Sequence, residues 1–136
     1  MVCWAVDSFA NDDAADWLTE LEGQSGLSLV ERTLDEVLDA SNAWLDAQQA
    51  ARALVAAEVI ASARGQAGLN ASAEPHLARW IAVVRPDPDA GLVARALLVI
   101  DRVLAEGSEL RTLWQESGEF DAWRRDVLCL RARLMV

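Results

Sequence analysis

Apolar residues recur along almost the whole chain at the three- and four-residue spacing of an amphipathic helix. Ala14, Trp17, Leu18 and Leu21 show the pattern near the start of the 136-residue chain, and residues with this spacing lie on one face of a helix. No segment alternates apolar and polar residues with the two-residue period of a half-buried strand. The spacing therefore predicts an all-α fold, a compact helical bundle with no sheet.

Capping and helix-ending residues divide the chain into about seven helices. Ser, Asp and Asn side chains accept backbone hydrogen bonds at helix N-termini, whereas Gly is common where helices end. The predicted N-caps are Asn11 or Asp12, Ser28, Asp46, Ser72, Asp87 and Ser108. The predicted ends are at Gly23, Gly65 and Gly118. A chain of this length can bury a real core, so we expect residues 1–136 to form a single all-helical domain.

Two of the predicted helices are apolar on nearly every face. The helix over residues 46–64 should be largely buried, and the helix over residues 88–106 is expected to be the structural centre. The tetrapeptide ARAL occurs at Ala51–Leu54 and again at Ala94–Leu97. A duplicated helical hairpin would explain this match, and chance identity between alanine-rich helices would explain it equally well.

The negative charge of the chain is concentrated in its first third. The whole chain has 22 acidic and 12 basic residues and a formal net charge of −10. Residues 1–50 contain eleven acidic residues and one basic residue, Arg32, while residues 51–136 contain eleven of each. This asymmetry repels nucleic acid and anionic membranes, and it favours a cationic partner.

Six carboxylates of this acidic third are the candidate partner-binding residues. They are Asp12, Asp13, Asp16, Glu31, Asp35 and Asp39. The last three are spaced by four residues and so form one row along a helix. The first hypothesis is a non-enzymatic interaction protein that binds a basic protein partner through this surface.

Two other readings of the acidic residues remain open. Asp12 and Asp16 lie one helical turn apart and could bind a hard cation such as Mg²⁺ or Ca²⁺, or form part of a small-ligand site or an enzyme. Capping and the helix dipole alone also explain carboxylates at a helix N-terminus, so we assign no metal and no cofactor. In the other reading the domain is purely structural and its acidic face is only solvated.

Residues that commonly carry catalysis are scarce. His76 is the only histidine, so catalytic triads and zinc sites lack bases and ligands. No glycine-rich phosphate-binding loop occurs. We expect Cys3 and Cys129 to be free thiols in a reducing compartment, with a bridge between them as the less favoured alternative. Cys129 and His76 could form a nucleophile pair, although a thiol in an apolar helix is usually inert. No catalytic residue is assigned.

The tryptophans divide into predicted core residues and one predicted surface residue. Trp17, Trp80 and Trp123 lie on apolar stripes of predicted helices, so we expect them in the core. Trp44 lies between two predicted helices, where no pattern requires its burial. It is therefore the candidate exposed aromatic residue.

No apolar segment is long enough to cross a membrane. The longest apolar run, from Leu92 to Leu104, is interrupted by charged residues and falls short of the roughly 20 residues that a spanning helix needs. The opening residues do not resemble a signal peptide, because Asp7 and two further aspartates interrupt them. We therefore expect a cytoplasmic location.

Three segments resemble a known protein family. They are Trp4 with Phe9-x-Asn11-Asp12-Asp13-Ala14-x-Asp16-Trp17, then Ala57-Glu58-Val59-Ile60-Ala61, and last Ser108-Glu109-Leu110-Arg111-x-Leu113-Trp114. In this order and spacing the chain resembles the bacterial domain of unknown function family 4259. The resemblance implies a small all-helical bacterial protein of about this length, and it brings no activity or catalytic residue. The chain departs from the family at Val2, Ala5 and Asp7, where glycines are expected.

Overall fold

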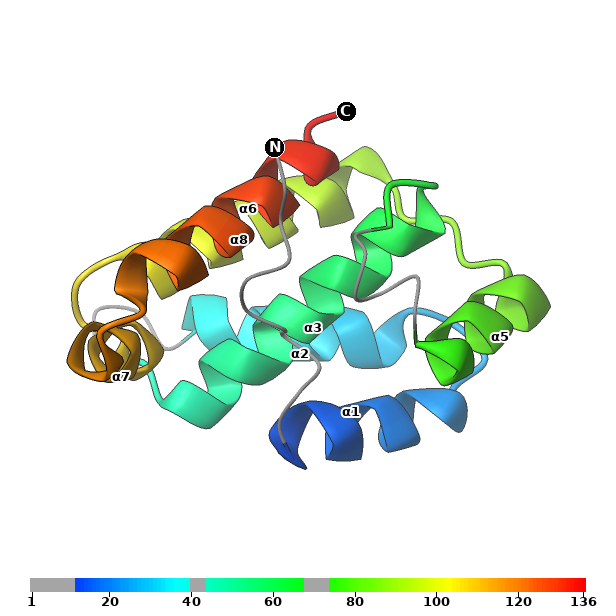
Figure 1. Cartoon of the computed structure of the whole chain (residues 1–136). Coiled ribbons are helices and arrows are strands. Elements are labelled where there is room, and N and C mark those ends of the chain that lie inside the picture. The colour runs from blue at the N-terminus through cyan, green and yellow to red at the C-terminus, as the bar shows by residue number, and fades with distance from the viewer. Residues whose placement is uncertain (1–11, 40–43, 68–73) are drawn as a thin grey trace.

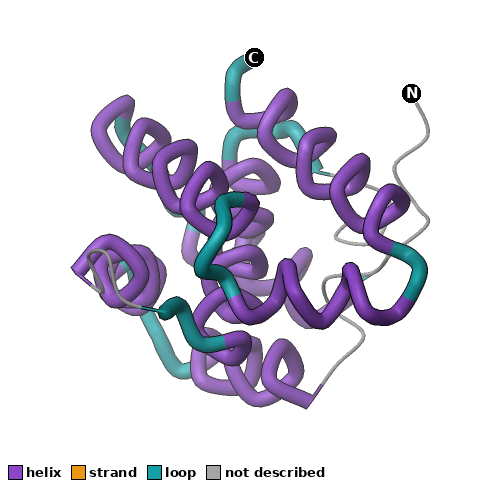
Figure 2. Tube along the Cα trace, turned by 90° about the vertical axis from the view of Figure 1, so that its left-hand side faces the viewer, coloured by secondary structure: helices purple, strands orange, loops and turns teal. Residues whose placement is uncertain are grey.

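The computed structural model describes residues 12–39, 44–67 and 74–136. The helices in these segments are α1 (Asp12–Glu22), α2 (Ser28–Asp39), α3 (Ala47–Ala63), α5 (Pro75–Val84), α6 (Ala90–Leu104), α7 (Glu109–Ser117) and α8 (Phe120–Leu134). Figure 2 shows helices and loops and no strand in the described segments. The all-α prediction is confirmed. None of the described helices has the length and apolar character needed to cross a membrane.

Helix α3 is the central element of the fold. It packs against each of the other described helices, and in Figure 1 it runs through the middle of the molecule. Residues 53–61 are all buried, as predicted for this segment, and its many alanines let the neighbouring helices approach closely. The prediction that the helix over residues 88–106 forms the centre is wrong. One face of α6 meets solvent, where Leu98 is 58% exposed.

The buried side chains form one contiguous apolar cluster. Trp17, Trp80 and Trp123 all belong to it, which confirms their predicted place in the core. Trp17 Nε1 donates a hydrogen bond of 2.9 Å to Thr33 Oγ1, and this buried contact joins α1 to α2. Trp80 Nε1 donates one of 3.0 Å to the carbonyl of Gln24, which joins α5 to the loop between α1 and α2. The indole N–H groups of Trp17 and Trp80 therefore both have an acceptor.

Two predicted N-caps are correct and one is displaced. The side chains of Asp46 and Ser108 accept backbone N–H bonds at the starts of α3 and α7, as predicted. Helix α6 is capped by Asp89 rather than by Asp87. Both aspartates have suitable chemistry, and Asp89 is the one whose carboxylate meets the N–H of Leu92, at 2.8 Å.

The predictions for the two remaining serine caps are both wrong. Ser28 is the first residue of α2, and the carbonyl of Leu27 accepts the first helical hydrogen bond, from the N–H of Glu31. Ser28 therefore lies inside the helix and is not its N-cap. Ser72 lies outside the described residues, but the N-cap position of α5 is Glu74, so the prediction of Ser72 as the cap is wrong. Helix α5 begins at Pro75, a first position that suits proline because its N–H would have no helical partner.

The helix pairing does not support a duplicated hairpin. Helix α2 packs along α3, whereas α5 packs on α1 and α3 rather than on α6. A duplicated hairpin would place each ARAL segment on the second helix of a packed pair. The two segments lie on α3 and α6, but only α3 packs on the helix that precedes it among the described helices. Chance identity is the better explanation of the repeated tetrapeptide.

A buried ion pair joins the central helix to the last helix. Glu58 on α3 is 6% exposed and accepts two hydrogen bonds of 3.0 Å from the guanidinium of Arg133 on α8. Arg133 also donates to the carbonyl of Gln66, at 3.1 Å. Arg64, at the end of α3, donates to the carbonyl of Leu134, at 2.8 Å. Charge-assisted hydrogen bonds therefore fix the end of α8 to α3.

Cys129 on α8 is buried and disulfide-bonded. The prediction of a free thiol is therefore wrong for this residue, while Cys3 lies outside the described residues. A bonded sulfur cannot act as a thiolate nucleophile, which removes Cys129 and His76 as a nucleophile pair. Disulfides persist mainly in oxidising compartments, whereas the prediction of free thiols assumed a reducing one.

Candidate functional site

The six predicted partner-binding carboxylates lie on α1 and α2. Asp12 and Asp13 open α1, but their side chains are outside what the structure describes. Asp16 on α1 and Asp39 at the end of α2 are exposed, and neither contacts a cation in the described segments. These two carboxylates are thus available to an external partner.

Glu31 and Asp35 share one cation from a distant part of the chain. The guanidinium of Arg95 on α6 lies 2.9 Å from Asp35 Oδ1 and 3.4 Å from Glu31 Oε1. All three side chains are partly exposed, and ion pairs of this kind contribute at most about 1 kcal/mol. The α2 row is therefore partly neutralised at Glu31 and Asp35, and this neutralisation does not extend to Asp39.

The remaining acidic residues of α1 and α2 also differ in their partners. Glu20 pairs with Arg32 at 3.4 Å, and Glu22 lies 2.8 Å from Nδ1 of His76. Glu36 on α2 is exposed and has no ion pair within the described ranges. Sequence reasoning did not single out Glu36, although it belongs to the same acidic helix.

Trp44 is exposed, as the sequence predicts. Its side chain is 57% exposed, while the next residue, Leu45, is fully buried and forms a bridge with Ser108. The bridge fixes the backbone directly beside the exposed indole. Tryptophan is enriched among the residues that dominate protein interfaces, so Trp44 is a candidate apolar contact.

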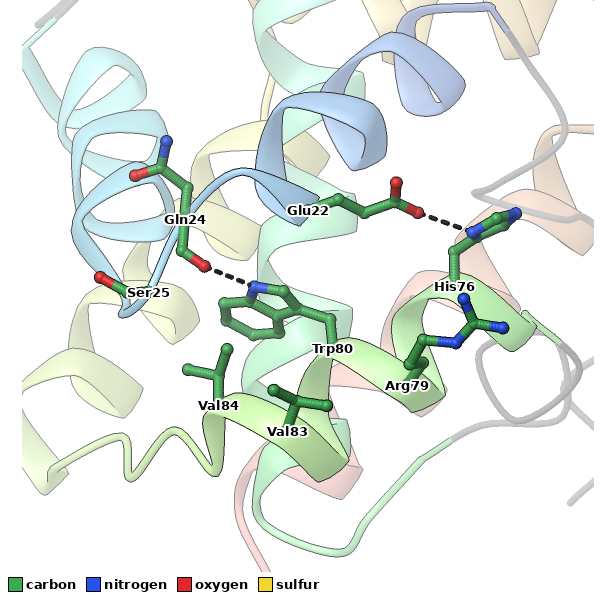
Figure 3. Close-up of a pocket in the computed structure, with 8 residues that line it drawn as sticks. All are labelled: Glu22, Gln24, Ser25, His76, Arg79, Trp80, Val83 and Val84. Carbon is green, nitrogen blue, oxygen red and sulfur yellow. Dashed lines mark hydrogen bonds and ion pairs between the residues drawn. The ribbon is translucent and has the colours of Figure 1, made fainter.

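A cleft of about 480 Å³ lies between α5 and the loop that joins α1 to α2 (Figure 3). It is lined by Glu22, Gln24, Ser25, His76, Arg79, Trp80, Val83 and Val84. None of the six predicted carboxylates lines it. Sequence reasoning missed this cleft because loop packing against α5 has no periodic signal. The sequence offers one sign of the cleft in the apolar residue Val83, whose side chain is 76% exposed in the structure.

The metal hypothesis is not tested by the structure. No group of three or more His, Cys, Asp or Glu side chains within the described segments could hold a metal ion, and the side chain of Asp12 lies outside what the structure describes. The pairing of Asp12 and Asp16 around a cation therefore stays a hypothesis.

The third family motif forms a junction between helix ends. Glu109 Oε1 accepts the backbone N–H of Ala47 at 2.9 Å, at the positive N-terminus of α3. Arg111 donates to the carbonyl of Leu104 at 3.1 Å, at the negative C-terminus of α6. Each charge has the sign that the local helix dipole favours. These motif positions therefore have a structural role, because they fix α7 against α3 and α6.

Replacing Glu109 with alanine should lower the free energy of unfolding by about 1 kcal/mol, the usual cost of a lost N-terminal cap. Chemical denaturation followed by circular dichroism measures the change. Glu116→Ala is the control, because Glu116 is exposed on the same helix and its loss should cost less than about 0.5 kcal/mol. Equal free energies of unfolding for the two variants would show that the hydrogen bond between Glu109 and Ala47 does not stabilise the fold.

The second motif contributes Glu58 to the buried ion pair with Arg133, so two of the three family segments have a clear role in packing. The family described as Domain of unknown function (DUF4259) matches the chain over residues 3–126. No curated protein and no solved structure matches the chain. The family match covers most of the 136 residues, and the chain belongs to the family Domain of unknown function (DUF4259).

Proposed function

We propose that this chain is a non-enzymatic protein-interaction module whose acidic N-terminal third binds a basic protein partner. One observation carries the proposal: α1 and α2 together contain nine acidic residues and one arginine, Arg32. Such an excess of carboxylates produces a negative potential that speeds encounter with a cationic surface and rejects anionic ones. Nucleic acids and anionic lipids are therefore poor partners for this surface.

The contribution of each carboxylate follows from its surroundings. Asp16, Glu36 and Asp39 are exposed and have no cationic partner in the described segments. These three carboxylates should therefore contribute most to the affinity for the basic partner. Glu31 and Asp35 should contribute less because Arg95 already neutralises part of their charge. Asp12 and Asp13 add charge at the first turn of α1. Trp44 supplies an exposed aromatic contact for the same partner.

The alternative functions have weaker support. A small-ligand, metal or enzyme site built from the N-terminal aspartates would have to lie outside the cleft beside α5, which no described aspartate lines. A purely structural domain would leave the acidic surface without any partner. The experiment below separates that possibility from the proposal.

A charge-neutralised variant tests the proposal. Wild-type protein on a resin should recover a basic protein from lysate of its own cells, and recovery should fall as the salt concentration rises. The triple variant Asp16→Asn, Glu36→Gln and Asp39→Asn should recover much less. These residues are exposed, so the variant should fold normally, which circular dichroism checks.

The control variant carries Asp87→Asn, Glu106→Gln and Glu116→Gln. It loses the same number of negative charges at exposed positions outside α1 and α2. It should recover the basic protein as well as the wild type does. Recovery of no basic protein by the wild type would favour the structural alternative, and equal losses in both variants would place the interaction elsewhere.

A further inference from the structure

We propose that the cleft between α5 and the α1–α2 loop binds a small carboxylic acid with an apolar body, and that Arg79 pairs with the carboxylate. The proposal does not depend on the acidic surface, because none of the six candidate partner-binding carboxylates lines the cleft. It rests on the size of the cleft, on its apolar wall and on the charge that remains unpaired beside that wall.

The cleft has the size and wall of a small-molecule site. Its volume of about 480 Å³ lies within the range of roughly 300–1,000 Å³ that is typical of ligand sites. Trp80, Val83 and Val84 supply an apolar wall along α5 (Figure 3). The hydrogen bond from Trp80 Nε1 to the carbonyl of Gln24 fixes the indole, so the wall is formed before a ligand arrives.

The charged residues of the cleft leave one cation without a partner. The carboxylate of Glu22 lies 2.8 Å from Nδ1 of His76, and both residues lie toward one end of the cleft. Arg79 lies on α5 beside His76, at the same end of the cleft as that pair, and Trp80 is the next residue along the helix (Figure 3). It is exposed and forms no ion pair with any described residue. The cleft of a strongly acidic chain thus presents an available positive charge.

A carboxylate with an apolar body matches this arrangement. The guanidinium group presents parallel N–H donors that fit the two oxygens of a carboxylate, while the hydrocarbon body covers the wall of Trp80, Val83 and Val84. A ligand with an ammonium group would meet repulsion from Arg79. A neutral ligand of the same shape would gain the apolar contact alone.

A second hollow, of about 440 Å³, lacks this property. Arg64 is the arginine that lines it, and the guanidinium of Arg64 already donates to the carbonyls of Leu134 and Val136. Both terminal nitrogens of this guanidinium therefore already donate to backbone carbonyls. The comparison identifies Arg79 as the feature that makes the cleft beside α5 selective for an acid.

Three probes of one shape test the proposal: phenylbutyrate, phenylbutanol and phenylbutylamine. The indole N–H signal of Trp80 in a proton–nitrogen NMR spectrum reports binding, and Trp80→Phe assigns it among the six tryptophans. The acid should bind roughly five-fold more tightly than the alcohol, as expected for a partly exposed ion pair. The amine should bind most weakly.

Matched variants identify the residue responsible. In Arg79→Gln the advantage of the acid over the alcohol should disappear, while in Arg124→Gln, which removes an exposed arginine on α8, it should persist. Val83→Ser should weaken acid and alcohol alike. No saturable shift at Trp80, equal binding of acid and alcohol to the wild type, or an acid preference that survives Arg79→Gln would each overturn the proposal.

Discussion

Replacing Trp17 with alanine should lower the free energy of unfolding by about 3–5 kcal/mol, the usual cost of truncating a buried tryptophan. The Trp17 side chain is 2% exposed and packs in the contiguous core. Its loss also removes the hydrogen bond to Thr33 Oγ1, although that hydroxyl still donates to the carbonyl of Leu29 at 2.8 Å. Urea denaturation followed by circular dichroism measures the change.

Trp44→Ala is the matched control for this prediction. It removes the same side chain from a position where most of the indole already meets water, so the free energy of unfolding should change by about 0.5 kcal/mol or less. Trp17→Phe should lie between the two variants, because it keeps most of the apolar contact and loses the hydrogen bond. Equal losses at Trp17 and Trp44 would contradict the assignment of one to the core and the other to the surface.

Breaking the buried ion pair should have the second largest effect. Arg133→Met leaves the carboxylate of Glu58 buried without its partner, and such changes cost about 3 kcal/mol or more. The control is Arg131→Met on the same helix. Arg131 pairs with Asp101 at 2.9 Å in a solvent-exposed position, where the hydrogen bond and negative charge of Asp101 raise the pKa of Arg131. An exposed pair of this kind is worth at most about 1 kcal/mol.

A double variant distinguishes the loss of the pair from the loss of a side chain. Glu58→Leu combined with Arg133→Met replaces both charges with apolar groups, and it should recover much of the stability that Arg133→Met loses. If the double variant were as unstable as the sum of the two single variants, the charges would act independently. That result would contradict a direct pair between α3 and α8.

The sequence predicts the fold wherever local chemistry decides it. Asp46 and Ser108 each cap a helix through contacts within three residues, and Trp17 is buried because it lies on a continuous apolar stripe. The position of Asp89 as the α6 cap could not be chosen over Asp87, because the two aspartates are chemically alike. The central helix could not be identified either, because α3 and α6 are both apolar and only their surroundings differ.

The sites depend on contacts that no local pattern contains. Arg95 lies 60 residues from Asp35 along the chain, and its pairing with the α2 row changes which carboxylates are available. The cleft beside α5 forms where a loop packs against Trp80, 56 residues away from Gln24 in sequence. Charge concentration and the exposure of Trp44 could be predicted from sequence, whereas these long-range contacts require the folded chain.

The salt dependence of partner binding tests the central claim most directly. Isothermal titration of the recovered basic protein with the wild type and with the two triple variants, at low and at moderate sodium chloride concentration, gives the dissociation constants. The account predicts that the variant with Asp16→Asn, Glu36→Gln and Asp39→Asn binds about ten-fold more weakly or worse, with a shallower salt dependence. The control variant should match the wild type. Equal affinity and equal salt dependence for all three proteins would contradict binding through the acidic surface of α1 and α2.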